Sequence, residues 1–184
     1  MKEHELHNYK LVLQYEGIRY NGWQKQKNQE NTIQEVVENA VFDGTGERAE
    51  VIGSGRTDAG THAMGQVANV KLGQDLEPER LMDNINKHLP SDIKILECEK
   101  VDNRFHARLN AKAKTYMYTL CVGKKPDVFN RRTVLHYCAD LDVNAMKKAA
   151  EYLKGEHDFM SFCSNKRTKK STVRKIYDIE IIKD

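Results

Sequence analysis

The stretch Gly53-Ser54-Gly55-Arg56-Thr57-Asp58-Ala59-Gly60-Thr61-His62-Ala63 lies between two short runs of residues that are typical of β-strands. Its three glycines allow backbone angles and close approaches that other residues resist. Between them stand a cation (Arg56), a carboxylate (Asp58) and an imidazole (His62), and a simple turn seldom needs all three. An Asp before Ala-Gly more often caps its own turn. Taken alone, the loop therefore leaves a structural and a functional interpretation open.

Outward from this loop, the hydrophobic pattern predicts six elements. Strands are expected at residues 9–15, 50–54, 66–72 and 93–101. Thr32-Ile33-Gln34-Glu35 has the pattern of a capping box, so one helix starts there and ends near Gly44. Pro78 opens a second helix that runs to about Lys87. The order strand, helix, strand, strand, helix, strand is ferredoxin-like and predicts an antiparallel sheet with both helices on one face.

A charged turn at residues 102–104 marks the expected boundary between two units, 1–103 and 104–184. The second unit is expected to contain a strand at 115–122, a helix capped by Asp142 that runs to Leu153 and ends at Gly155, and a strand at 173–182. This is the first part of another module of the same order. The predicted class is α+β, with an antiparallel or mixed sheet.

The composition suits a folded, soluble chain. Charged residues make up 31% and hydrophobic residues 39% of the 184 residues, with a net charge of +3. Four scattered cysteines (Cys98, Cys121, Cys138 and Cys163) form no C-x-x-C pair and are expected to be reduced thiols. The polar N-terminus lacks a signal peptide, and no run reaches the ~20 apolar residues that span a membrane. A cytoplasmic location is therefore expected.

A basic run near the C-terminus is the main local departure from an even charge distribution. Its members are Lys166, Arg167, Lys169, Lys170, Arg174 and Lys175. Clustered cations release counterions from nucleic acid, so the run is a candidate phosphate contact. A solvated loop has the same composition, and composition cannot separate the two.

Seven segments in order make the chain similar to one family. Besides the Gly53–Ala63 stretch they are Tyr15-Glu16-Gly17 with Tyr20-Asn21-Gly22-Trp23-Gln24; Thr32-Ile33-Gln34-Glu35; Asn86 to Pro90 with Asp92-Ile93; Phe105-His106-Ala107-Arg108; Lys114-Thr115-Tyr116-Met117-Tyr118; and Gly155-Glu156-His157-Asp158-Phe159 with Ser161-Phe162. Together they resemble the TruA family of tRNA pseudouridine synthases. The resemblance implies the pseudouridine synthase fold, built from two ferredoxin-like units of which the second is incomplete here.

The resemblance implies that the chain is an isomerase that converts uridine to pseudouridine without a cofactor or metal ion. It makes Asp58 the catalytic carboxylate, although the residues alone do not say whether Asp58 attacks the ribose, attacks the base or accepts a proton. Tyr116 would be the second catalytic residue, with its ring stacked on the target uracil and its hydroxyl assisting proton transfer. Arg56 would contact the RNA around the flipped nucleotide. His62 and His106 are left out of catalysis. Trp23, Phe159 and Phe162 are interpreted as packing residues, because buried aromatics are the commoner case.

The partners implied by the resemblance are a tRNA and a second copy of the chain. The target would be the anticodon stem-loop (positions 38–40), recognised largely by RNA shape. Lys166, Arg167, Lys169 and Lys170 would lie along the RNA backbone. No membrane partner is expected.

One departure from the family bears on activity. Family members continue past the position of Asp184 into a helix with the pattern F-x-x-x-M-V-R-x-I-x-G, whose Arg pairs with the catalytic Asp. Without that charge an ionised carboxylate in an apolar pocket loses its partner. The chain is therefore expected to be weakly active or inactive. The alternatives are an impaired member that binds tRNA without modifying it, and an oligomeric fragment with no RNA role. Thr61, where the family has Val, is expected to alter packing only.

Overall fold

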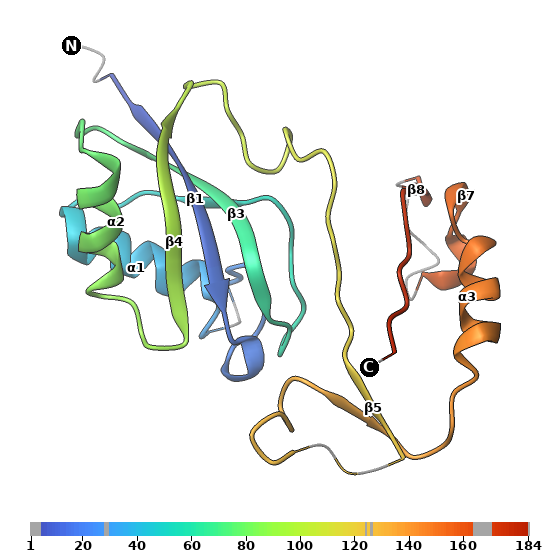
Figure 1. Ribbon diagram of the computed structural model, residues 1–184. Helices are drawn as coiled ribbons and strands as arrows, with labels where there is room; N and C mark the ends of the chain where they lie inside the picture. Colours follow the sequence, from blue (N-terminus) through green and yellow to red (C-terminus); the bar gives the residue numbers. More distant parts are fainter. Residues whose placement is uncertain (1–4, 28–29, 124, 126, 164–170, 184) are drawn as a thin grey trace. The chain divides into compact units, whose positions relative to one another are not determined.

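A computed structural model describes residues 5–27, 30–123, 125, 127–163 and 171–183. The chain divides into two compact units, Met1–Tyr116 and Met117–Asp184 (Figure 1). The basic residues Lys166, Arg167, Lys169 and Lys170 lie outside the described residues. Within the described part, no helix is long and apolar enough to cross a lipid bilayer.

The first unit has the six main elements that the hydrophobic pattern predicts, in the same order. They are β1 (His7–Tyr15), α1 (Ile33–Thr45), β2 (Val51–Gly53), β3 (Ala63–Leu72), α2 (Pro78–Asn86) and β4 (Ile93–Val101), with a short 3-10 turn, η1 (Gly17–Arg19), after β1. The four strands form one sheet in the order β2-β3-β1-β4, and every neighbouring pair is antiparallel. Strands β1 and β2 therefore run parallel with β3 between them, as in a split βαβ unit.

Apolar side chains at every second position of β1 give the sheet one face that packs against both helices. Tyr9, Leu11, Leu13 and Tyr15 are all buried, and they share one core with apolar residues of α1 and α2 (Figure 1). Because successive strand residues point to opposite faces, these four lie on the same side of the sheet. Both helices consequently cover one face.

Local signals define the ends of α1. The Thr32 hydroxyl accepts a hydrogen bond from the Glu35 amide at 3.4 Å, as the capping-box pattern predicts. At the other end Gly46 adopts a left-handed conformation with φ of 77° and donates its amide to Phe42. The predicted start of this helix is confirmed.

A pair of buried amides holds the segment after β4 against the sheet. The Asn8 side chain donates to the carbonyls of Asp102 and Phe105, both at 2.9 Å, and accepts from the Asn69 side chain at 3.1 Å. The Asn69 oxygen in turn accepts from the Ala107 amide at 2.9 Å. These bonds help to explain why residues 104–116 belong to the first compact unit, beyond the boundary expected at 103 and 104.

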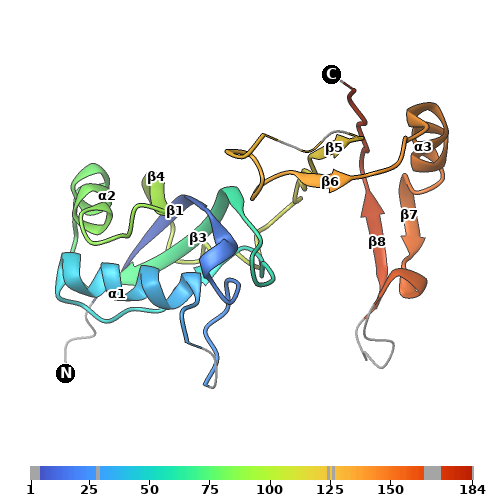
Figure 2. The ribbon, with the colours of Figure 1, turned by 90° about the horizontal axis from the view of Figure 1, so that it is seen from below.

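The described part of the second unit contains two small sheets and one helix. Strands β5 (Leu120–Val122) and β6 (Leu135–Tyr137) are parallel, and β7 (Gly155–Asp158) and β8 (Val173–Ile176) are antiparallel neighbours (Figure 2). Helix α3 (Val143–Glu151) starts at Asp142, whose carboxylate accepts from the Ala145 amide at 2.9 Å as predicted. A second 3-10 turn, η2 (Met160–Phe162), follows β7. The α+β class is confirmed.

Three expectations for the second unit are wrong. The strand expected at 115–122 begins only at Leu120, and the strand expected at 173–182 ends at Ile176. The C-cap of α3 is Tyr152, whereas Gly155, with φ of 96°, is the first residue of β7. A positive φ suits glycine at a sharp change of direction as well as at a helix end, so the residue type alone did not distinguish the two.

The four cysteines form no disulfide, in agreement with the expectation of reduced thiols. Burial raises the pKa of the Cys98 thiol to about 11, and the neighbouring Glu99 carboxylate acts in the same direction. Cys98 is consequently a neutral packing residue of β4.

The amide pair gives a test of the fold. Replacing Asn69 by Ala leaves the Asn8 oxygen and the Ala107 amide buried without this partner. We expect the free energy of unfolding to fall by about 2 kcal/mol or more, measured by urea denaturation. Asn103→Ala, at an exposed position of the adjacent turn, is the matched control and should change it little. Equal stability of the two variants would contradict the role given to Asn69.

Candidate functional site

The loop at residues 54–62 joins β2 to β3, and its charged side chains face solvent. Arg56 and Asp58 are exposed, and His62 is half-buried. The turn is closed by the backbone, because the Thr61 amide donates to the Asp58 carbonyl at 3.1 Å. Among the described residues, the Asp58 carboxylate has no hydrogen-bond or ion-pair partner. The side chain therefore does not cap its own turn, which favours the functional interpretation of this loop.

A segment between β1 and α1 supports the loop from beneath by close backbone contact. A Cβ added at Gly17 would lie 1.9 Å from the Thr61 carbonyl oxygen, and one added at Gly22 would lie 2.5 Å from that of Thr57. The Trp23 amide donates to the Thr57 carbonyl at 3.0 Å. Gly17 and Gly22 are thus glycines because the two backbones touch.

Trp23 itself fills the space beneath the start of the loop. Its side chain is 2% exposed, and its indole lies against Gly53, where an added Cβ would come within 2.5 Å of the ring. The Trp23 and Tyr15 rings lie 6.2 Å apart between their centroids. The interpretation of Trp23 as a packing residue is confirmed.

Two tyrosines attach the loop to the rest of the first unit. The Tyr15 hydroxyl forms a hydrogen bond with the Thr57 hydroxyl at 3.0 Å, and the Tyr20 carbonyl accepts from the Gly60 amide at 3.2 Å. The Tyr20 hydroxyl donates to Asp92 at 2.6 Å, and Arg19 lies 3.4 Å from the same carboxylate. Burial, followed by the hydrogen bond to Asp92, raises the pKa of Tyr20. Tyr20 therefore stays a neutral donor at physiological pH.

Arg56 and two cations from later in the sequence lie beside Gly55. Arg56 and Arg108 line a small hollow of about 20 Å³ together with Gly53, Gly55 and the Trp23 and Gln24 side chains. The Lys114 ammonium packs over Gly55, where an added Cβ would be 2.4 Å from its nitrogen. The first unit thus places an exposed carboxylate and three cations on or beside one loop.

Arg108 and Lys114 are the residues that sequence reasoning missed as site candidates. Both stand in segments quoted for the family resemblance, but about fifty residues separate them from the loop. Arg108 follows directly after Ala107, whose amide is held by Asn69. Their distance in sequence hid their proximity to the loop, since the contacts of Asn8 and Asn69 that direct the chain there leave no periodic pattern in the sequence.

Among the described residues, no contact brings Tyr116 to the loop. Tyr116 is 71% exposed and precedes β5 rather than lying within a strand. Its assignment to the site stays a prediction, as do those of Asp58 and Arg56.

The two phenylalanines of the second unit pack differently from the expectation. Phe159 is half-buried, but Phe162 is 73% exposed, so the interpretation of Phe162 as a buried packing residue is wrong. The two rings contact each other at 5.7 Å between centroids, and His157 lies edge-on to Phe159 at 5.9 Å. Within the described residues, no cluster of three His, Cys, Asp or Glu side chains could hold a metal ion.

The support beneath the loop can be tested by adding one methyl group. Gly17→Ala forces the Thr61 carbonyl to move, so we expect the free energy of unfolding to fall by about 1–3 kcal/mol. The amide NMR signals of residues 57–61 should shift as well. Gly65→Ala is the control, because its Cβ would meet only Val12 at an ordinary 3.9 Å. A Gly17→Ala protein as stable as the control, with unshifted loop signals, would show that the contact is unimportant.

The comparisons with known proteins agree on one family. The family described as tRNA pseudouridine synthase matches residues 11–110 and 149–184. The tRNA pseudouridine synthase A 2 of Bacillus cereus (strain ATCC 10987 / NRS 248) is 43% identical over 179 residues, which cover 97% of this chain and 73% of that protein. The tRNA pseudouridine synthase A of Bacillus sp. (strain KSM-64) is 45% identical over 176 residues, or 96% of this chain and 72% of that protein. The chain therefore belongs to the tRNA pseudouridine synthase family.

Proposed function

We propose that this chain isomerises uridine to pseudouridine in the anticodon stem-loop of tRNA, with Asp58 as its catalytic carboxylate. The single observation that carries the proposal is the exposed Asp58 side chain on a loop whose backbone is held by Gly17, Gly22 and Trp23. A fixed backbone with an unoccupied carboxylate suits a group that acts on an incoming substrate. Membership of the family supports the same conclusion.

The reaction is balanced without any second reactant. The N1–C1′ bond of the nucleotide breaks, the uracil rotates, and C5 bonds to C1′ while the hydrogen of C5 is lost and N1 becomes protonated. A carboxylate serves this sequence either as a nucleophile or as a proton acceptor. The proposal assigns one of these roles to Asp58 and needs no cofactor.

The cations beside Asp58 suit a polyanionic substrate. Arg56, Arg108 and Lys114 lie around Gly55, within one short stretch of surface. Side chains of this type bind phosphate oxygens and release counterions when they do so. We propose that these three residues contact the RNA backbone on either side of the target uridine, with Arg56 nearest to the flipped nucleotide.

Residues outside the Asp58 loop have roles in RNA binding as well. Tyr116 would stack on the target uracil, and its exposed ring is accessible for that purpose. Lys166, Arg167, Lys169 and Lys170, outside the described residues, would contact the RNA backbone. We also propose that residues 104–184 form part of a second ferredoxin-like unit and that the protein acts as a homodimer.

A member of the family that binds tRNA without modifying it is the second candidate. The observation that favours it is the lack of a charged partner for Asp58 among the described residues, since a carboxylate enclosed by RNA needs one to remain ionised. The two candidates differ in product formation and agree in RNA binding. One experiment therefore separates them.

The catalytic assignment predicts the loss of pseudouridine in one variant. Asp58→Asn keeps the size of the side chain but removes the carboxylate, so product formation from unmodified tRNA should fall by at least ~10²-fold. Chemical mapping of pseudouridine measures the product and its position. Asp43→Asn, an exposed position on α1, is the control and should retain activity. Binding of tRNA by the unaltered chain without any product would instead favour the second candidate.

The cationic cluster predicts a change in salt dependence. Arg108→Gln and Lys114→Gln should each weaken tRNA binding and lower the slope of log affinity against log salt concentration by about 1. Filter binding or fluorescence anisotropy over a range of KCl concentrations measures the slope. Arg80→Gln and Lys87→Gln remove the same charges at exposed positions in or next to α2 and should leave it unchanged. Equal slopes in all four variants would rule out a phosphate contact at Arg108 and Lys114.

A further inference from the structure

We infer that Gln24 and Gln34 are positioning residues for Arg56, which they hold in place through a hydrogen-bond relay anchored on Glu38. The inference rests on the proposed function, in which Arg56 contacts the RNA. It goes beyond that function because neither glutamine is expected to touch the substrate.

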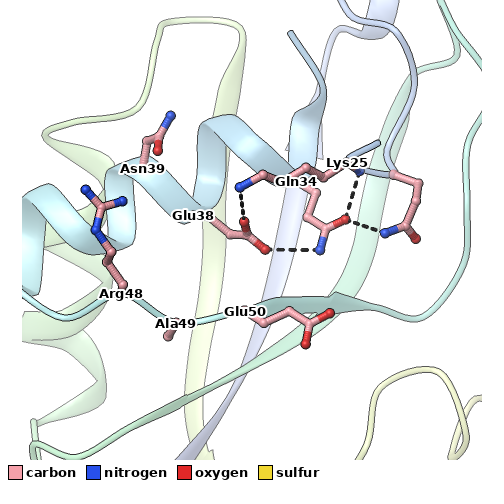
Figure 3. A pocket seen from close by; sticks show the side chains of 8 residues that line it. Lys25, Gln34, Glu38, Asn39, Arg48, Ala49 and Glu50 are labelled. Atoms are coloured by element: carbon pink, nitrogen blue, oxygen red, sulfur yellow. Dashed lines mark hydrogen bonds and ion pairs between the residues drawn. The ribbon is translucent and has the colours of Figure 1, made fainter. Parts of the chain in front are cut away.

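The relay is a continuous series of four side chains. The Arg56 Nε donates to Gln24 Oε1 at 3.3 Å, and Gln24 Nε2 donates to Gln34 Oε1 at 2.7 Å. Gln34 Nε2 then donates to Glu38 Oε1 at 3.0 Å. Figure 3 shows the inner part of this series, with Gln34 and Glu38 pointing from α1 into an open hollow of about 460 Å³.

Both ends of the relay determine the orientation of its two amides. A Glu38 carboxylate only accepts hydrogen bonds, so Gln34 must turn its NH₂ group toward it. The Gln34 oxygen then accepts from the Lys25 backbone amide at 3.0 Å, which can only donate. Gln24 must consequently present its NH₂ to Gln34 and its oxygen to Arg56, whose guanidinium only donates. No flipped orientation of either amide satisfies all of these partners.

The inner end of the relay is more buried than its outer end and has more partners. Gln34 is 4% exposed, and the Glu38 side chain is 14% exposed and pairs with the Lys25 ammonium at 3.1 Å. Glu38 Oε1 also accepts from the amide of Val51, the first residue of β2, at 3.2 Å. The same carboxylate therefore anchors the strand that enters the loop and, through the glutamines, a side chain within it.

The outer end points to a role beyond stabilising the fold. Gln24 is only half-buried, and it leads from the buried Gln34 to an exposed arginine. A bond to Nε engages one donor of the guanidinium and leaves its two terminal nitrogens available for a phosphate oxygen pair. Holding the arginine in this way before binding reduces the side-chain freedom that is lost when RNA arrives.

The first test needs no RNA. NMR measures hydrogen exchange at the Arg56 Nε–H, which the relay should slow. We expect exchange to become faster in Gln24→Ala and also in Gln34→Ala, although Gln34 does not touch Arg56. Asn39→Ala is the matched control, because Asn39 lines the same hollow on α1 but stands outside the relay. Unchanged exchange in Gln24→Ala, the more exposed and better tolerated variant, would overturn the relay.

The second test is a double-mutant cycle on affinity for an unmodified tRNA transcript. Gln24→Ala should weaken binding about 3- to 10-fold in the otherwise unaltered chain and have almost no effect in an Arg56→Ala background. Equal effects in both backgrounds would show that Gln24 acts independently of Arg56 and would overturn the inference. Binding without pseudouridine formation would refute the proposed activity while the cycle still decides the relay. A chain that did not bind tRNA at all would refute both the proposed function and the positioning role.

Discussion

The contact between Gly17 and the Thr61 carbonyl is the constraint on which the candidate site depends. No side chain fits between the two backbones, so the segment after β1 and the loop after β2 can pack together only when glycine stands at this position. The hydrogen bonds of Trp23, Gly60 and Tyr15 all join residues 15–23 to the loop. These contacts hold the backbone on both sides of Asp58, whose side chain is exposed.

The site combines a buried support with an exposed chemical surface. Trp23 and Gln34 are almost completely buried, whereas Arg56 and Asp58, which they help to place, are exposed. The conformational entropy of the loop is therefore lost when the first unit folds and not when RNA binds. The groups that are proposed to meet the RNA can then remain solvated until it binds.

The N-terminal fold could be predicted because its local and tertiary signals agree. The alternation of β1, the Thr32 cap and Pro78 each point to the element that forms. The Asp58 loop could be found because its unusual residues are adjacent in sequence. Arg108 and Lys114 were missed as site candidates because tertiary bonds from Asn8 and Asn69 help to determine the path of the chain toward them. The short strands β6 and β7 were not predicted, since three or four residues cannot display a period of two clearly. β2 is equally short, but it leads into the unusual Asp58 loop, which marked its end.

The buried amides of Asn8 and Asn69 also control the alignment of neighbouring strands. A shift of β1 against β3 by two residues would preserve which side chains face the helices, so apolar contacts alone discriminate weakly against it. In the observed register Asn8 lies opposite Lys71 and Asn69 opposite Lys10, which brings the two amides together diagonally. A slip by two residues in the direction that moves Asn8 away from Asn69 would separate the two amides and leave buried polar groups unpaired, at about 1–3 kcal/mol each. The two asparagines therefore favour the observed pairing of β1 with β3 over that slipped register.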